Sequence, residues 1–249
     1  MPIADMAYVR SRRSNIWRVI HRSSPALVCS GSFGILLIAA VRQKGFTRIG
    51  KIQDRMACVS RGEMRAGDIV HRIAAAEAYD AAHKRSRGDV AGRDLANAVS
   101  GVLASHYHAF ATEPLAVESV IVQINATPDQ DSLLYVGPDG SIRPFEHILY
   151  LRTPPPPVGA LMAGRGDRHR DNRRGSKTQQ AEEALERLND RLRETYTDEP
   201  TASDAITMLR RMPDLQPLLS ADARRDAVLL DRSALQRHAY GDVFRRLQV

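Results

Sequence analysis

The run Asp54-Arg55-Met56-Ala57-Cys58-Val59-Ser60-Arg61-Gly62 and the later run Asp89-Val90-Ala91-Gly92-Arg93-Asp94-Leu95-Ala96-Asn97 decide how this chain folds. The first run contains a short apolar stretch, residues 56–60, with the length and composition of a strand. The second begins with Asp89, a residue type that caps helices well, and continues into an apolar stripe of helical period. Between them the apolar period changes from two residues to about 3.6. The sequence therefore predicts that a sheet gives way to two long helices.

Upstream of these runs the sequence predicts one helix and three more strands. Residues 4–21 place apolar side chains among arginines near helical spacing, which favours a basic amphipathic helix. Residues 26–30 and 33–40 are typical of two strands, and Gly31-Ser32 is expected to form the tight turn between them. A further strand is expected at residues 48–51.

The two long helices are each predicted to turn one side toward the sheet. The first covers residues 63–84 and the second starts at Asp89. The inward side chains are expected to be Ile69, Val70, Ile73, Ala76 and Ala81 on the first helix, and Leu95, Ala98, Val99, Val102, Leu103 and Phe110 on the second. Strands at 117–125, 132–136 and 147–151 follow, with Pro138-Asp139-Gly140 turning the chain between the last two.

The last hundred residues begin with a stretch that is too polar and too rich in proline to pack. Residues 153–177 contain four successive prolines and then an Arg-rich run, which predicts a disordered insertion. Helical periodicity returns at Gln180. A second helix is expected from the capping box Thr201-x-x-Asp204 to Pro213, and a final strand at 227–230.

Composition is typical of a folded protein with one sizeable core. The chain has 249 residues, of which 43% are hydrophobic, and a formal net charge of +7. The positive excess lies at residues 10–22 and 165–174. Cys29 and Cys58 lie in apolar runs without metal-binding spacing, which favours buried, reduced thiols in a cytoplasmic protein and no disulfide.

One signal near the N-terminus leaves an alternative open. Ser11-Arg12-Arg13-Ser14 resembles a twin-arginine export signal, and an apolar run follows at residues 25–41. Small and polar residues interrupt that run, which is also shorter than the ~20 apolar residues that span a bilayer. A buried hairpin is therefore favoured over an export segment.

The two opening runs resemble motifs of actinobacterial 20S proteasome α-type subunits. Asp54, Arg55 and Gly62 match a strand motif of that family, and the run from Asp89 to Asn97 is similar to the start of its second long helix. The resemblance covers residues 16–152 and resumes weakly at 181–212 and 224–247. It implies the α/β (α+β) class and the four-layer α-β-β-α sandwich of N-terminal-nucleophile hydrolases. Residues 1–22 would then be a gate segment and basic helix, and residues 23–249 one proteasome-like domain that carries the insertion at 153–177.

The resemblance also implies a role without catalysis of its own. An active proteasome β-type subunit needs a threonine at its own N-terminus, whose amine activates the hydroxyl. Here no threonine precedes the first strand, and Ser30 lies in an expected hairpin, not in a nucleophile elbow. His106 and His108 are two residues apart on a helix, which is wrong for a metal pair. No nucleotide-binding motif is present, so no cofactor and no metal are expected.

Several residues acquire expected roles from the family. An activator's C-terminal carboxylate would dock at Arg48, which stands where the family has a lysine, with Lys51 as a nearby substitute. The motif residues Asp54, Arg55, Gly62, Asp89, Arg93 and Asn97 would support the fold and the ring. The gate segment would consist of Met1, Pro2, Ile3, Ala4, Asp5, Met6, Ala7, Tyr8 and Val9.

The implied partners are other copies of the chain in a heptameric ring, a β-type subunit that carries the protease, and an activator ATPase ring. Two other functions stay open. One is a proteasome-like paralogue that forms a homo-oligomeric scaffold or regulator without β subunits. The other is nucleic-acid binding through the Arg-rich segments, although aromatic residues are only 5% of the chain and supply no stacking platform among the arginines.

Overall fold

The structure is a computed structural model that describes residues 3–41, 47–109, 112–146, 148–151, 206–207, 225–237 and 243–247, with side chains from Ser11 onward. The helices and strands, with the short 3-10 helices as η, follow in chain order: α1 (Ile3–Arg22), β1 (Ala26–Gly31), β2 (Gly34–Ala40), β3 (Ile49–Gln53), β4 (Met56–Gly62), α2 (Met64–Lys84), η1 (Arg87–Asp89), α3 (Gly92–His108), β5 (Val117–Gln123), η2 (Pro128–Gln130), β6 (Ser132–Val136), β7 (Ile142–Pro144), β8 (Ile148–Leu151), β9 (Arg225–Asp231), α7 (Arg232–Gln236) and β10 (Phe244–Leu247).

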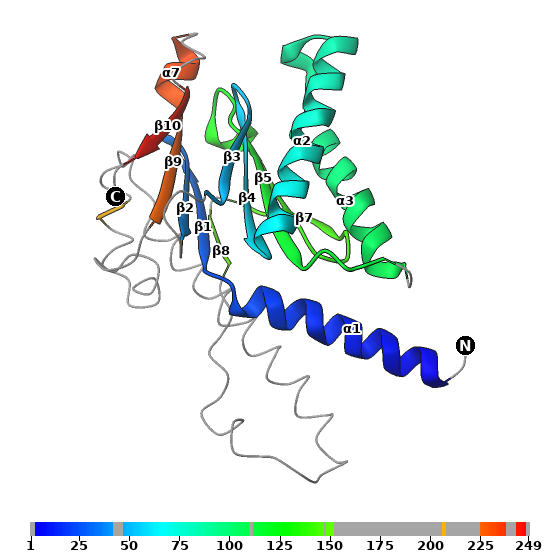
Figure 1. Ribbon diagram of the computed structural model, residues 1–249. Helices are drawn as coiled ribbons and strands as arrows, with labels where there is room; N and C mark the ends of the chain where they lie inside the picture. Colours follow the sequence, from blue (N-terminus) through cyan, green and yellow to red (C-terminus); the bar gives the residue numbers. More distant parts are fainter. Residues whose placement is uncertain are drawn as a thin grey trace.

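These strands form two five-stranded sheets that pack face to face (Figure 1). One sheet has the order β10-β9-β2-β1-β8 and the other β3-β4-β5-β6-β7, and neighbouring strands are antiparallel in both. Their facing sides share one apolar core, in which Val28 and Leu37 of the first sheet join Val59 and Val122 of the second. Because side chains alternate along a strand, alternate residues of the central strands β1, β2, β4 and β5 enter this core.

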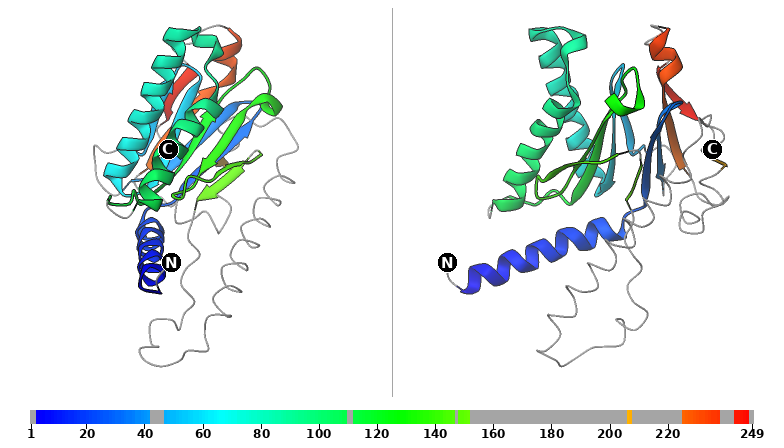
Figure 2. Two further views of the ribbon diagram at one scale, coloured as in Figure 1. Left: turned by 90° about the vertical axis from the view of Figure 1, so that its right-hand side faces the viewer. Right: turned by 180° about the vertical axis from the view of Figure 1, so that it is seen from behind.

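Helices α2 and α3 cover the outer face of the second sheet, as seen from two sides in Figure 2. Their inward stripe consists mainly of alanine on α2 and of leucine and valine on α3: Ala66, Val70, Ala74, Ala78, Ala81, Leu95, Val99 and Leu103 are buried. The predicted pair of long helices on one sheet face is confirmed, with α2 beginning one residue after the expected Glu63. The prediction for Ala76 was wrong, because this residue is exposed and the stripe passes through its neighbours at helical spacing.

The outer face of the first sheet is apolar as well. Leu27 and Cys29 of β1 and Leu36 and Ile38 of β2 are buried there, with Ile206 packed against them. This explains why β1 and β2 lack polar alternation: strands buried on both faces are apolar throughout. The described residues thus build three layers of the expected sandwich, one of helices and two of sheet. The helices predicted near residues 180 and 201–213, and the insertion at 153–177, fall almost entirely outside the described residues.

Helix α1 lies across one end of the sandwich and projects beyond it with its N-terminal half (Figures 1 and 2). Ile16 and Ile20 are its buried anchors, and they pack with Ala116, Trp17 and Tyr107. Arg12 donates hydrogen bonds to the carbonyl oxygens of His106 and Thr112, at 2.7 and 2.5 Å. The guanidinium of Arg13 lies 5.5 Å from the centroid of the Tyr107 ring.

The segment that resembles an export signal is therefore part of the packed structure. Arg12 and Arg13 hold α1 against the end of α3, and the apolar run that follows forms the β1–β2 hairpin. Among the helices that the structure describes, none has the length and apolarity needed to cross a bilayer.

Two turns differ from the sequence prediction. Gly31 pairs with Gly34, so the β1–β2 turn consists of Ser32 and Phe33 and lies one residue later than expected. The Pro138-Asp139-Gly140 turn leads into the short strand β7, which the sequence did not predict, and only then does the chain cross to β8 in the other sheet. β10 and α7 were also missed, because a strand of four residues and a helix of five carry too little periodicity to be recognised.

Gly62 supplies a first testable prediction, because it has a φ of 132° and ends β4 against the backbone of Ala116. A Cβ at this position would lie 2.2 Å from the Ala116 carbonyl oxygen. We expect Gly62→Ala to lower the free energy of unfolding by about 2 kcal/mol or more, since both φ and the contact are unfavourable.

Gly101→Ala is the matched control for Gly62→Ala. Gly101 lies inside α3 with nothing within 4 Å of a built Cβ, so the substitution should raise stability by about 0.5–1 kcal/mol. Urea unfolding followed by circular dichroism measures both variants. Equal midpoints for the two would contradict this explanation of Gly62.

Candidate functional site

Arg48 directly precedes β3, and its guanidinium binds the backbone of the neighbouring strand β4. Its Nη1 donates to the carbonyl oxygens of Ser60, at 3.5 Å, and Gly62, at 3.2 Å. The Arg48 carbonyl oxygen in turn accepts from the Ser60 amide. The half-buried Arg48 thus stabilises the end of the β3–β4 hairpin.

Lys51 is the more accessible of the two candidate docking cations. Its side chain is 38% exposed, and its Nζ lies 3.1 Å from Oδ1 of Asp54. An exposed pair of this kind is worth about 0–1 kcal/mol, so a competing carboxylate can displace Asp54 at little cost. The Lys51 carbonyl oxygen is held by Nε2 of His71 on α2, at 2.9 Å, which fixes the strand beside the helix.

The Asp54-Arg55 turn connects the two motif runs. Arg55 donates from Nη2 to the carbonyl oxygen of Gly88, at 3.0 Å, and so joins the β3–β4 turn to the segment between α2 and α3. The Arg55 carbonyl oxygen accepts from the amide of Ile124 after β5. The first run is therefore bonded to the residue that directly precedes the second run, at one end of the second sheet.

Asp89 does not cap α3, so this prediction was wrong. It ends η1, and its carboxylate accepts a hydrogen bond from the Ser86 hydroxyl at 2.8 Å. Helix α3 begins at Gly92, whose amide donates to Oε1 of Gln123 at 2.6 Å. The cap therefore comes from β5, 31 residues away. Reading along the sequence misses such a partner, because N-caps are normally sought next to the helix.

Arg93 and Asn97 lie one turn apart on α3 and are both exposed. Their neighbours Leu95 and Ala96 are buried against the sheet. The second motif thus divides into an inward part, which packs the core, and an outward part, which is available to another molecule.

The proposed gate residues are part of α1 as far as the structure describes them. The helix starts at Ile3, so Ile3 to Val9 continue the helix that carries Ile16 and Ile20. Met1 and Pro2 lie outside the described residues. Ile3 to Val9 form the N-terminal part of α1, whose C-terminal part lies against one end of the sandwich (Figure 1).

A buried ion pair that the sequence analysis missed lies under α1. Nη1 of Arg61 is 2.6 Å from Oε1 of Glu118, and the two side chains are 4% and 5% exposed. Tyr135 donates from its hydroxyl to Oε2 of Glu118 at 2.9 Å. Burial, followed by the charge of Glu118, raises the pKa of Tyr135 well above its usual range, so the phenol stays protonated. The sequence does contain a signal for this pair: Arg61 in β4 and Glu118 in β5 each place a charge at a position where the alternation of the strand predicts an inward side chain.

A second buried cluster closes the opposite end of the sandwich. The two terminal guanidinium nitrogens of Arg232 donate to the Asp131 carboxylate, Nη2 to Oδ2 at 2.6 Å and Nη1 to Oδ1 at 3.1 Å. Nη2 also donates to the carbonyl oxygen of Gly31, and the Ser30 hydroxyl donates to Asp131 at 2.6 Å. This cluster connects the β1–β2 hairpin, the β5–β6 connection and the start of α7.

The described residues offer no set of side chains that would hold a metal ion. His106 donates from Nδ1 to the Glu113 carbonyl oxygen at 3.0 Å, and His108 packs edge-on against Tyr107. Cys29 and Cys58 are buried free thiols, and burial raises the pKa of Cys58 to about 11. A thiol with so high a pKa is a poor nucleophile.

Comparison with known proteins supports the resemblance. No protein-family model matches the chain. A protein named "Proteasome subunit alpha" from Acidothermus cellulolyticus is 30% identical over 124 residues, which covers 49% of this chain and 53% of that protein. The proteins of the same name from Salinispora arenicola and Xylanimonas cellulosilytica are each 28% identical, over 134 and 233 residues. The Salinispora match covers 54% of this chain and 49% of that protein, and the Xylanimonas match covers 92% and 83%.

The chain therefore spans about half the length of most of the curated relatives that it matches, and most of the length of one. These relatives share the name of the family to which the motif runs point. The two antiparallel sheets and their covering helices are compatible with its fold. The chain is a divergent relative of the actinobacterial proteasome α-type subunits.

Proposed function

We propose that the protein is a non-catalytic α-type subunit of a bacterial 20S proteasome. It would form a heptameric ring in the cytoplasm, stacked on β-type subunits, and take part in protein degradation by gating the ring and docking an activator ATPase. The observation that carries this proposal is the similarity to a proteasome α subunit over 92% of the chain, at 28% identity. The homo-oligomeric paralogue without β subunits remains the alternative.

The outward part of the second motif supports assembly. Arg93 and Asn97 are exposed on α3 although they belong to the run that most resembles the family, and the inward residues of that run already account for the packing of the core. Exposed polar side chains that the fold does not need are candidates for contacts with another subunit.

The surroundings of β1 support the absence of a nucleophile. In a β-type subunit the threonine would have to be the first residue before this strand. Here β1 follows Pro25 and a 20-residue helix, α1, which lies across that end of the sandwich.

A pull-down with the β-type subunit from the same genome tests the assembly role. With a tag on the β subunit, the untagged chain should co-purify, and Arg93→Ala combined with Asn97→Ala should reduce its recovery at least about tenfold if each loses 1 kcal/mol or so of contact energy. Lys84→Ala is the matched control, because Lys84 is an exposed cation on α2 that pairs with Asp80 of its own helix at 2.5 Å. Retention of the wild-type chain at background level would contradict the proposal.

The docking role is tested separately with a peptide that carries the C-terminal residues of the activator ATPase. Lys51→Ala should weaken its binding to the assembled ring about tenfold or more, since it removes the accessible cation. Amidation of the peptide's terminal carboxyl group should have the same effect. Unchanged binding in both experiments would move the docking site away from Arg48 and Lys51.

A further inference from the structure

Helix α1 is attached to the sandwich through a small apolar cluster of its own. Ile16 and Ile20 are buried against Ala116, and Trp17 and Tyr107 pack around them. Among the side chains that the structure describes, these two isoleucines are the only buried apolar residues of α1. The cluster is separate from the three larger ones that hold the two sheets, α2 and α3 together. Removal of α1 would therefore expose few apolar side chains and leave the main core packed.

Arg12, a polar anchor of α1, is incompletely satisfied in the docked position. Its Nη2 donates to the carbonyl oxygens of His106 and Thr112 at the end of α3 and beyond it. Its Nε is buried and has no hydrogen-bond partner in the described part of the chain. A buried donor without an acceptor costs free energy, which water restores when the helix leaves. The net contribution of Arg12 to docking is therefore smaller than its two hydrogen bonds suggest.

The C-terminal half of α1 covers a charged pair at the end of the space between the two sheets. Val59 and Val120 belong to the core that the sheets share. Arg61 and Glu118 lie two residues further along the same two strands and are paired with each other, so they point into the same space. Here α1 contacts β4 and β5, and the two charged side chains are 4% and 5% exposed. Taking two charges out of water costs free energy even when they are paired, so hydration of the pair favours an open form.

We propose that α1 is a lid that opens separately from the rest of the protein and admits water to the Arg61–Glu118 pair. In the open form the two sheets, α2 and α3 stay folded. The helix itself unravels, because an isolated helix of 20 residues is marginal in water. Opening concerns the single chain and does not depend on ring assembly. If the proposed function holds, opening would also move the gate residues Ile3 to Val9, which belong to the same helix.

Hydrogen exchange of the full chain tests whether α1 opens separately. We expect the amides of residues 16–22 to exchange at least about 100-fold faster than those of residues 95–103 in α3, after correction for intrinsic rates. Ile20→Ala should speed exchange in α1 about tenfold or more, because it removes one of the two buried anchors. Equal protection of α1 and α3 would mean that the helix leaves only when the whole chain unfolds, and would overturn the proposal.

Val99→Ala is the reciprocal control, because Val99 is buried on α3, outside the cluster that anchors α1. This variant should speed exchange in α3 several-fold and leave exchange in α1 unchanged. The reason is that the open and closed forms both contain the packing of α3, so the substitution destabilises them equally. An equal acceleration of exchange in α1 and α3 would contradict separate opening.

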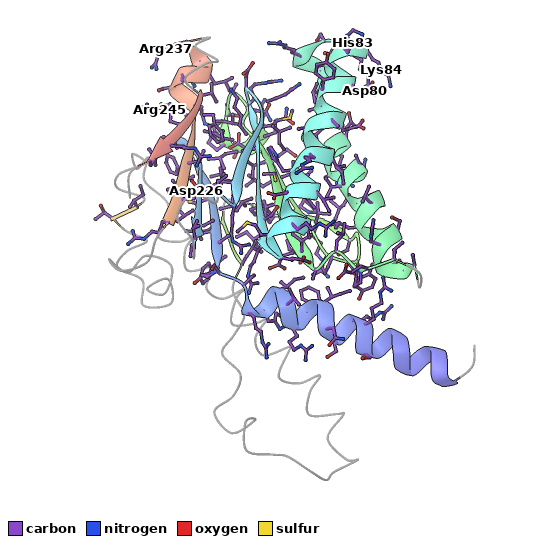
Figure 3. All side chains as sticks on the ribbon, in the orientation of Figure 1. Asp80, His83, Lys84, Asp226, Arg237 and Arg245 are labelled. Atoms are coloured by element: carbon purple, nitrogen blue, oxygen red, sulfur yellow. The ribbon has the colours of Figure 1, made fainter. Side chains whose placement is uncertain are left out.

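Thiol labelling tests the same opening from the side of the sandwich. Ala116→Cys places a thiol beneath the two anchors of α1, whereas Ala74→Cys places one beneath α2 in the main core. Lys84→Cys, at the exposed far end of α2 (Figure 3), gives the rate of an accessible thiol. The native thiols of Cys29 and Cys58 are buried, so the background reaction is slow.

The order of the labelling rates decides the outcome. Ala116→Cys should react at least about 100-fold faster than Ala74→Cys, and more slowly than Lys84→Cys, because its thiol is reached only from the open form. Adding Ile20→Ala should bring the Ala116→Cys rate closer to that of Lys84→Cys. Equal rates for Ala116→Cys and Ala74→Cys, or no response of Ala116→Cys to Ile20→Ala, would overturn the proposal.

Discussion

Replacing Arg232 with methionine is expected to lower the free energy of unfolding by about 3–5 kcal/mol. The Asp131 side chain is 1% exposed and Arg232 only 4%, so removal of the guanidinium leaves a carboxylate buried without its counter-charge. The Asp131 carboxylate would keep hydrogen bonds from the Ser30 hydroxyl and the Asn125 amide, but both of these donors are neutral. Chemical denaturation of the isolated chain measures the loss.

The position of this cluster makes the effect global. Arg232 also donates to the carbonyl oxygens of Gly31, at the end of β1 in the first sheet, and Asn125, just after β5 of the second sheet, so the substitution releases both from a common partner. Arg237→Met is the matched control: Arg237 is exposed at the end of α7 and contacts the Ser233 hydroxyl at 3.2 Å, so its loss should stay within about 0.5 kcal/mol. Similar midpoints for the two variants would show that solvent reaches Asp131 easily.

Replacing Arg61 with methionine is expected to be about as costly, again near 3–5 kcal/mol. Glu118 would remain buried with Tyr135 as a neutral donor but without its counter-charge, since the Arg61 and Glu118 side chains are 4% and 5% exposed. Part of the cost can be relieved by protonation of Glu118. The variant should therefore regain stability as the pH falls toward the range in which carboxylates titrate, whereas the wild type should not.

A double substitution separates the pair from its surroundings. Arg61→Met combined with Glu118→Leu replaces both charges by apolar groups, and should be less destabilised than Arg61→Met alone. Tyr135 then loses its acceptor, so Tyr135→Phe in the same background should recover part of the remaining loss. A double variant as unstable as the single one would contradict the view that an unpaired Glu118 causes the damage.

The periodicity of apolar residues predicted those helices and strands whose bounds depend on the residues within them. The bounds of α2 follow from a run with one helical period, and β5 from alternating valine and isoleucine; both are confirmed within two residues. The cap of α3 failed because its acceptor, Gln123, arrives from another strand. The charged clusters were missed for the same reason: Arg61 and Glu118 are 57 residues apart, and Asp131 and Arg232 are 101 apart, so no spacing in the sequence shows that they meet.

For the candidate site too, the sequence identified residues but not the contacts that they make. The resemblance identified the residues that matter to the family, but their contacts depend on the folded chain. Gly62 proved to be required by a backbone contact, and Arg55 to bind the Gly88 carbonyl oxygen just before the second motif run. Arg48 proved to bind the backbone of β4. The exposure of Arg93 and Asn97 follows from the face of α3 on which they lie. Their part in a ring stays a prediction, because it concerns a second molecule.

The most direct test of the central claim is the mass of the complex formed when the chain is co-expressed with the β-type subunit of the same genome. We expect stacked heptameric rings that contain both chains and cleave a fluorogenic peptide, with cleavage abolished when the N-terminal threonine of the β subunit is replaced by alanine. A monomer, or a ring of this chain alone without peptidase activity, would contradict the account and indicate a paralogue that kept the fold for another task.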